Sequence, residues 1–238
     1  MRIVLIILLA FACLPAASAQ NAAGVFGPVV DENTRQLEFR WSIAEPDDGL
    51  TPWVQRAHWE QGLSDRLSYR LGVQWRDRSS SSDVELDFVR GMLFFEAGQP
   101  TENWTTGFRF DARARNGSRP DELALSWTNQ YALGPSTFAR FNVMSFFQIG
   151  DSAPDNPIIE TRSTVVKRLR EGRSVALELY NVYGEFGQFG GWSDQRHELA
   201  PVYSTPIFNG YYLWSSIAVG LSEPVPDYTL RFRVGKRF

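Results

Sequence analysis

The amino-acid sequence predicts an all-β protein: an antiparallel transmembrane β-barrel of twelve strands with short periplasmic turns and longer extracellular loops. Three observations lead to this prediction. Apolar and aromatic residues alternate with charged residues over most of the chain, short connections between strands alternate with long ones, and the last strand ends on a phenylalanine. Alternation with a period of two is typical of strands with one apolar and one polar face. A wall between lipid and water needs strands of this kind.

Residues 1–19 have the layout of a secretory signal peptide. Arg2 precedes the apolar run IVLIILLAFACL, and small residues follow that end in Ala17-Ser18-Ala19. This order predicts cleavage after Ala19. The apolar run is short for a membrane-spanning helix, which needs about 20 apolar residues. Cleavage removes Cys13, the only cysteine, so the mature chain is expected to have no disulfide and no cysteine nucleophile.

Composition sets wider limits on location and partners. The chain has 24 basic and 27 acidic residues and no basic tract, which argues against a nucleic-acid partner. Export without disulfides favours the envelope of a Gram-negative bacterium, and the barrel pattern favours its outer membrane. We expect residues 20–35 to be a periplasmic N-terminal leader, with an inserted plug as the alternative, and residues 36–238 to form the barrel.

The strands are identified by their alternation. In residues 37–43, Leu, Phe, Trp and Ile alternate with Glu, Arg and Ser, and residues 67–76, 104–111 and 122–131 repeat the pattern. Seven other segments fit it less cleanly. The expected strands are Leu37–Ile43, Trp53–Glu60, Leu67–Arg76, Val84–Phe95, Trp104–Asp111, Glu122–Tyr131, Phe138–Gln148, Ile158–Leu169, Val175–Tyr183, Arg196–Ser204, Tyr211–Leu221 and Tyr228–Phe238.

The connections support the same topology. Tight turns are expected within residues 62–65, 133–136 and 170–173, and longer loops within residues 44–52, 150–157 and 184–195. Outer-membrane barrels have short periplasmic turns and longer extracellular loops. An even number of strands then returns the C-terminus to the periplasm. Residues 96–103, EAGQPTEN, are expected to be an unusually long turn.

A soluble sandwich or a lipocalin-like barrel is the alternative fold. Soluble β proteins bury the apolar face of each strand and expose the polar face. Here charged residues occupy the middle of strands whose other face carries Trp, Tyr and Phe. Lipid outside and water inside account for both faces, because a closed barrel leaves no backbone group unpaired.

The C-terminal strand carries a resemblance to a known class of proteins. A terminal aromatic residue with apolar residues at alternate positions resembles the signal by which bacterial outer-membrane proteins are handed to their insertion machinery. Lys236 departs from that pattern. The matching positions are Tyr228, Leu230, Phe232, Val234 and Phe238.

The wider tail, with LYNVYG, QRHELAPV and GLSEPVPDYTLRFRVGKRF, is similar to proteobacterial outer-membrane proteins associated with the meta-pathway of phenol degradation and often described as transporters. The resemblance covers about the last quarter of the chain. It implies an outer-membrane β-barrel and the passage of small aromatic or apolar solutes, and it assigns no functional residue.

The polar face of the strands is expected to line the lumen. The functional interpretation is a charged channel that selects or orients a solute. The alternative is a network of ion pairs that fills a narrow barrel. Arg231 and Arg233 stand on the strand that closes the barrel, with Glu38 as a candidate partner and Tyr212 and Trp214 as candidate cation–π partners. The candidate lumen-lining residues are Glu38, Arg40, Arg56, His58, Arg70, Glu85, Asp87, Arg109, Asp111, Arg113, Arg140, Arg231 and Arg233.

Two other function classes remain open at this point. One is a lipid-modifying enzyme at the outer rim, but neither His58 nor His197 shows the close His-x-Ser spacing of such enzymes, so we expect no enzyme. The other is a structural or adhesive envelope barrel without transport. The expected partners are outer-membrane lipid and lipopolysaccharide, the insertion machinery and a small-molecule solute.

No cofactor and no metal site are expected. Two histidines and no mature cysteine make no ligand cluster for a transition metal. Asp47-Asp48-Gly49, and Asp151 with Asp155, could bind calcium at the rim. Acidic residues are far more common in loops simply as turn formers.

Overall fold

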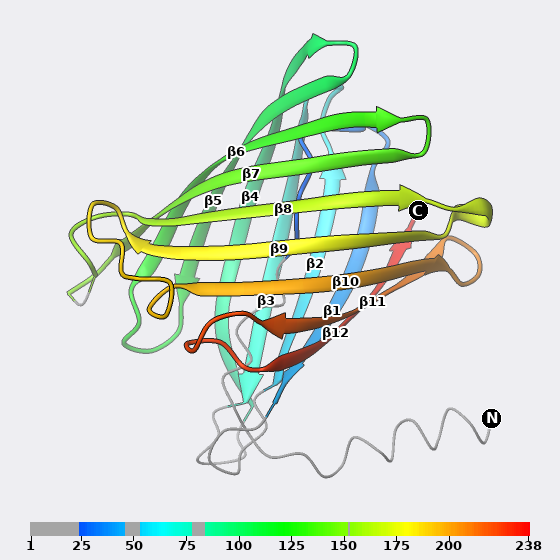
Figure 1. Ribbon diagram of the computed structural model, residues 1–238. Helices are drawn as coiled ribbons and strands as arrows, with labels where there is room; N and C mark the ends of the chain where they lie inside the picture. Colours follow the sequence, from blue (N-terminus) through cyan, green and yellow to red (C-terminus); the bar gives the residue numbers. More distant parts are fainter. Residues whose placement is uncertain (1–23, 46–52, 78–83, 152) are drawn as a thin grey trace, which may run out of the picture.

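The computed structural model is a closed β-barrel (Figure 1). It describes residues 24–45, 53–77, 84–151 and 153–238, so the expected signal peptide, residues 1–19, lies outside the described residues. Each strand pairs with its sequence neighbours, and the first and last strands pair with each other. All twelve pairings are antiparallel. The predicted fold class, a twelve-stranded antiparallel barrel, is confirmed.

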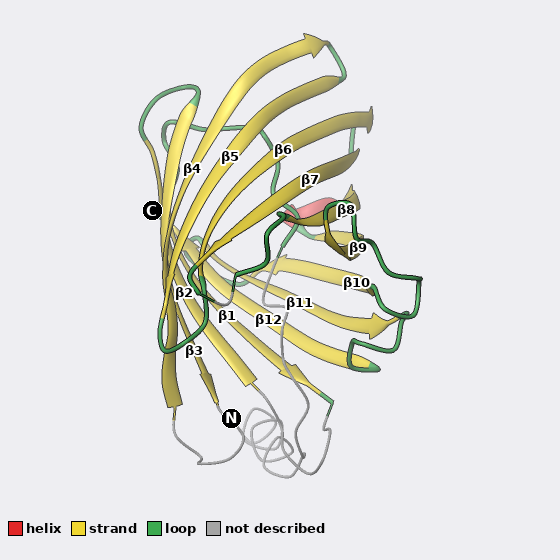
Figure 2. Ribbon diagram, turned by 90° about the vertical axis from the view of Figure 1, so that its left-hand side faces the viewer, coloured by secondary structure: helices red, strands yellow, loops and turns green. Residues whose placement is uncertain are grey.

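The strands are tilted against one another and wind around a common interior (Figure 2). In the described residues the one helix is the short 3-10 turn η1 (Arg170–Gly172), and no helix there is long and apolar enough to cross a membrane. The strands are β1 (Arg35–Ala44), β2 (Trp53–Gly62), β3 (Leu67–Asp77), β4 (Val84–Thr101), β5 (Trp104–Arg115), β6 (Asp121–Gly134), β7 (Thr137–Ile149), β8 (Ile158–Arg168), β9 (Ser174–Glu185), β10 (Arg196–Pro206), β11 (Tyr211–Gly220) and β12 (Tyr228–Arg237).

The short turns and the C-terminus share one end of the barrel, which we call the turn end; the opposite end is the loop end. The Phe238 amide donates to the Arg35 carbonyl over 2.9 Å, which places the last residue at the start of β1. In the turn between β10 and β11, Asn209 and Gly210 have φ angles of 44° and 79°. Asn and Gly are the residues that accept this left-handed conformation most readily.

The expected long turn at residues 96–103 is wrong. Strand β4 continues to Thr101, β5 begins at Trp104, and these two residues pair directly. The register shifts at Gly98, whose φ is 143°. The glycine therefore marks a β-bulge within a long hairpin, where one extra residue is accommodated without ending the strand pairing.

The two faces of the wall differ in the way a membrane barrel requires. On β5, Phe108 and Phe110 are 38% and 51% exposed, whereas Arg109 between them is 0% exposed. The other strands of the barrel show the same arrangement, with apolar and aromatic side chains on the outer face and polar or charged side chains on the inner face. Such an exterior suits lipid, and such an interior suits water and ion pairs.

A bulge between β3 and β4 changes the phase of β4. The register shifts at Gln74 and Trp75, and Asp87 and Phe88 are both buried although they are adjacent in sequence. From Phe88 onward the inward positions are those with even numbers, so Arg90 faces the lumen.

The described start of the chain lies inside the barrel. Val25 packs with Tyr180, Ala200 and Ala218 of three strands. The Phe26 ring packs against Phe94 at 5.6 Å between centroids. We call residues 24–30 the N-terminal segment. This placement differs from a leader in the periplasm and corresponds to the inserted alternative. The lumen offers the segment apolar contacts and a side-chain acceptor, since the Val30 amide donates to Glu96 Oε2 over 2.9 Å.

The seam between β1 and β12 is bridged by one tyrosine from β11. The register places Glu38 opposite Gly235, and Gly235 opposite Tyr212. The Tyr212 hydroxyl crosses over Gly235 and donates to Glu38 Oε2 over 2.7 Å. A Cβ at Gly235 would lie 2.3 Å from Tyr212 Cζ and from its hydroxyl oxygen. Glycine at this position therefore lets β11 reach β1.

We predict that Gly235→Ala lowers the free energy of unfolding by about 1–3 kcal/mol, because the new methyl group overpacks the site and displaces Tyr212 from Glu38. Urea unfolding in detergent micelles measures this. The matched control is Gly91→Ala on β4, where a Cβ meets nothing within 4 Å and stability should hold or rise. Equal losses in both variants would contradict this account of the seam.

Candidate functional site

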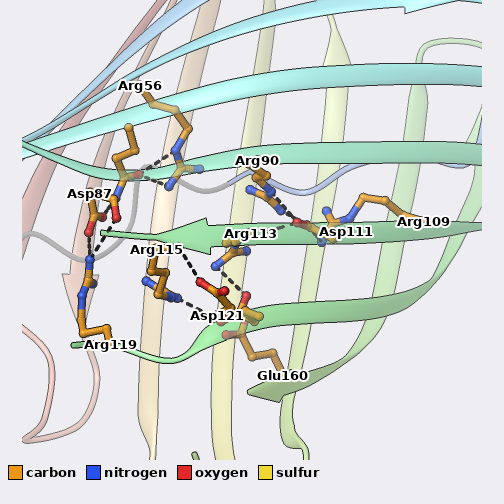
Figure 3. Close-up of polar contacts among 12 residues, drawn as sticks. Arg56, Asp87, Arg90, Arg109, Asp111, Arg113, Arg115, Arg119, Asp121 and Glu160 are labelled. Carbon is orange, nitrogen blue, oxygen red and sulfur yellow. Dashed lines mark hydrogen bonds and ion pairs between the residues drawn. The ribbon is translucent and has the colours of Figure 1, made fainter. Parts of the chain in front are cut away.

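One carboxylate organises the charged lumen. Asp111 projects inward from the middle of β5, between Arg109 and Arg113 on the same face. Arg90 of β4 donates Nε to Asp111 Oδ1 over 2.7 Å and Nη2 to Oδ2. Arg109 Nη2 lies 3.6 Å from Oδ2, and Arg113 Nε lies 3.7 Å from Oδ1. Figure 3 shows Asp111 between Arg90 and Arg109, with Arg113 beside it. We call these four residues the Asp111 cluster.

The ion pairs continue from this cluster towards the loop end. Arg113 Nη1 lies 2.8 Å from Glu122 Oε1, and Arg115 Nη2 lies 3.0 Å from the other carboxylate oxygen. Glu122 stands on β6 opposite Arg113 in the register. Cross-strand pairs of this kind connect β4, β5 and β6 through their side chains as well as their backbones.

A second carboxylate, that of Asp87, connects β4 to side chains of β3 and of the β5–β6 loop. Asp87 of β4 forms an ion pair with Arg119 of the β5–β6 loop (Figure 3), and it accepts a hydrogen bond from Gln74 of β3. Arg76 Nε lies 3.4 Å from Asp87 Oδ1. Gln74 in turn accepts from Arg56 Nε of β2 over 2.7 Å. A chain of polar contacts therefore runs from β2 to the loop end of β5.

The seam residues pair differently from the sequence-based expectation. Arg231 forms its ion pair with Glu198 of β10, and Arg40 of β1 binds Glu38 with Nε 2.6 Å from Oε1. Of the two candidate partners of Glu38, Arg231 thus pairs elsewhere, whereas Arg233 lies near enough to Glu38 to interact with its charge. The register explains this, because Arg231 lies opposite Ser42 and Ser216, and its long side chain reaches one strand further to Glu198. The expected cation–π contact is made by Arg233, whose guanidinium carbon lies 3.7 Å from the Trp214 ring centroid.

The N-terminal segment lies among arginines. The guanidinium carbons of Arg109, Arg70 and Arg40 lie 4.7, 4.9 and 5.8 Å from the Phe26 ring centroid. These arginines come from β5, β3 and β1, so one ring contacts guanidinium groups from three strands. Cation–π attraction makes an aromatic ring the apolar group best suited to a cationic lumen.

A cavity of about 140 Å³ lies beside Phe26 towards the loop end of the barrel, and we call it the lumen cavity. Its lining contains five arginines and two glutamates. Glu160 is bound by Arg162 over 2.6 Å, and Glu198 is bound by Arg231. The lining residues are Phe26, Arg56, Arg90, Arg113, Glu160, Arg162, Tyr180, Asn181, Val182, Arg196 and Glu198.

The structure places each candidate lumen residue on the inner face. Those that are buried are Glu38, Arg40, Arg56, His58, Arg70, Asp87, Arg109, Asp111 and Arg231. Those that are half-buried are Glu85, Arg113, Arg140 and Arg233. Arg56 and Arg113 come together at the lumen cavity, whereas Arg40 and Arg70 contact the Phe26 ring and Glu38 pairs with Arg40. Sequence reasoning missed Phe26, Arg90, Arg196 and Glu198.

His197 belongs to a different environment, under the β9–β10 loop. Its Nδ1 lies 2.8 Å from Asn181 Oδ1, and the Trp192 ring stacks on it at 3.7 Å between centroids. Its Nε2 is buried without a hydrogen-bond partner among the described residues. No described hydroxyl is therefore hydrogen-bonded to His197 Nε2, the position from which a histidine base would activate a serine.

The structure offers no metal cluster in the residues it describes. No group of three or more His, Cys, Asp or Glu side chains there is arranged to hold an ion. The possible calcium ligands Asp47 and Asp48 lie outside the described residues.

Comparison with known proteins finds the same fold in solved outer-membrane proteins. No family model and no curated protein matches the chain. An outer membrane channel from Pseudomonas putida F1 matches with a TM-score of 0.68 and 11% identity over 92% of this chain and 100% of that chain. The NanC porin gives 0.64 and 9%, and the KdgM porin gives 0.61 and 9%, each over 85% of this chain and 98% of theirs. At such identities the likeness shows a shared fold.

We predict that Asp111→Asn destabilises the barrel by about 3–5 kcal/mol, because it leaves Arg90, Arg109 and Arg113 without the carboxylate that they share. Urea unfolding in micelles measures the loss. The same substitution at Asp65, which is 82% exposed in a turn, serves as the control and should leave stability unchanged. A neutral Asp111→Asn variant would show that the cluster is not what stabilises the wall.

Proposed function

We propose that this chain is a channel for small solutes in the outer membrane of a Gram-negative bacterium. Residues 1–19 would serve as the signal peptide for export and be cleaved, and the N-terminal segment occludes the lumen in the structure described. The observation that carries the proposal is the lumen cavity. Charged groups from β2, β4, β5, β8 and β10 converge there inside a wall whose exterior is apolar. A purely structural barrel needs lumen ion pairs, but it does not need a charged space that remains unfilled beside them.

The size of the barrel limits the solute. About eight strands give an interior that side chains fill, and sixteen or more leave an open aqueous channel. Twelve strands lie between, and here ion pairs and the N-terminal segment occupy much of the lumen. Small solutes therefore suit this lumen. The resemblance of the tail to the phenol-degradation group favours aromatic or apolar solutes.

Reversible occlusion follows from how the N-terminal segment is held. Val25 packs among Tyr180, Ala200 and Ala218. Phe26 is bound by cation–π and van der Waals contacts, and the Val30 amide donates one hydrogen bond to the Glu96 side chain. Each such contact is worth on the order of 1 kcal/mol, so the segment can leave without unfolding the wall. The strands themselves are fixed by continuous ladders on both edges.

The membrane partners follow from the outer face. We propose that outer-membrane lipid and lipopolysaccharide contact it, and that Tyr228, Leu230, Phe232, Val234 and Phe238 form the signal for the insertion machinery. Phe238 is 64% exposed at the end of β12, where an insertion factor can reach it. Its ring also packs on Trp59 at 5.9 Å between centroids.

Two alternatives keep specific support. A structural barrel without transport would account for the ion pairs and the occluded lumen. A lipid-modifying enzyme would account for His197 held by Asn181, but it needs a hydroxyl at Nε2, which no described residue supplies. The channel accounts for the lumen cavity as well, and we therefore prefer it.

We predict that the purified protein forms discrete channels in planar lipid bilayers, and that Phe26→Ala raises its open time or conductance because the N-terminal segment loses its arginine contacts. Phe110→Ala is the matched control, since that ring faces lipid, and it should behave like the unchanged protein. Absence of channels in all three proteins would favour the structural barrel.

A further inference from the structure

We infer that the lumen cavity is a binding site for a small organic carboxylate, that is, an anion with a body about the size of one ring. This names the solute class of the proposed channel and so rests on the proposed function for its biological meaning. Binding itself does not require conduction and is measured without it. The inference rests on the charge, the free donors and the apolar wall of the cavity.

The charge of the lining favours an anion. Five arginines face two glutamates, and both carboxylates are already engaged, Glu160 by Arg162 and Glu198 by Arg231. Guanidinium groups gathered in a site shielded from bulk water repel one another, and an opposite charge among them relieves that repulsion. A cationic solute would add to the repulsion, and a neutral one would leave it unchanged.

Two of the arginines have donors available to a ligand. Arg196 lines the cavity and forms no close ion pair with a described residue, although Glu198 and Glu160 act on its charge from further away. Arg113 is held by Glu122 through Nη1, but its Nε has no hydrogen-bond acceptor among the described residues, and the Asp111 oxygen paired with Nε is 3.7 Å away. The planar fork of a guanidinium matches the two oxygens of a carboxylate.

These two arginines approach the cavity from different sides. Arg113 stands on β5 and Arg196 on β10, and five strand steps separate the two strands in the ring of twelve. A carboxylate between them would contact both walls of the lumen. Ion pairing within the wall explains the contacts of Arg90 with Asp111 and of Arg162 with Glu160. Arg196 interacts with Glu198 and Glu160 only at longer range and makes no close contact of this kind.

The rest of the lining suits an apolar body. Phe26, Tyr180 and Val182 contribute aromatic and aliphatic surface beside the arginines. The volume of about 140 Å³ is close to that of an apolar protein cavity of about 150 Å³ that holds benzene. One ring with one carboxylate therefore matches the cavity in both size and chemistry.

The test is calorimetric titration of the full mature chain in detergent micelles with three probes of one shape: benzoate, benzamide and benzylammonium. We expect saturable binding of benzoate, with the neutral and cationic probes weaker by about tenfold or more, the ratio that one charge-assisted hydrogen bond supplies. Equal binding of benzoate and benzamide, or no saturable binding of benzoate, would overturn the inference.

The variant Arg196→Gln should weaken benzoate about tenfold without unfolding the barrel, because Arg196 makes no ion pair that the wall depends on. Arg196→Lys should restore part of the affinity, and Arg66→Gln in an exposed turn should change nothing. Unchanged benzoate affinity in Arg196→Gln would refute the assigned site. If benzoate binds but no bilayer channels form, the proposed function is refuted and this inference stands. If channels form but benzoate does not bind, this inference is refuted and the proposed function stands.

Discussion

The structure depends on the sharing of few carboxylates among many guanidinium groups inside a closed wall. Because the outer face meets lipid, the charges of the strands must point inward, where water is scarce. A buried guanidinium is tolerated when a carboxylate or a polar acceptor neutralises its cost. Asp111 meets this need for Arg90, Arg109 and Arg113 at once, and Glu122 and Asp87 extend the same arrangement towards the loop end.

The sequence could predict a strand and its inward residues where the two faces of that strand differ in polarity. Strands such as β1, β5 and β12 alternate charged and aromatic residues, so both the fold class and the inward residues could be deduced. In β4 apolar residues stand on both faces after Asp87, with Phe88 and Met92 inside beside Arg90 and with Val89 and Leu93 outside. Periodicity alone could not detect the bulge there, and Arg90 was assigned to no face. The ion-pair partners of the lumen residues were harder still to predict, because strand register and tilt determine that Arg231 reaches Glu198.

The placement of the N-terminal segment could not be deduced from its own residues. GVFGPVV has no alternation, no charge and two glycines, which fits a flexible leader as well as a plug. Its position is determined by the lumen instead. An apolar ring gains little among charged groups except through cation–π attraction, and Phe26 lies where guanidinium groups from three strands converge. Only the assembled barrel creates that position.

The occluding segment and the lumen cavity share one electrostatic centre. Phe26 lines the cavity and also packs on Arg109, which belongs to the Asp111 cluster. Arg90 and Arg113 of the same cluster line the cavity. An anion in the cavity would therefore attract Arg90 and Arg113, which share Asp111 with Arg109. Through Asp111 it would affect Arg109, which packs against the Phe26 ring. Since coupling between two sites is reciprocal, if release of the segment changes the affinity of the cavity for an anion by some factor, a bound anion changes the release of the segment by the same factor. If the barrel conducts as proposed, selecting a solute and opening for it would both follow from this one charge balance.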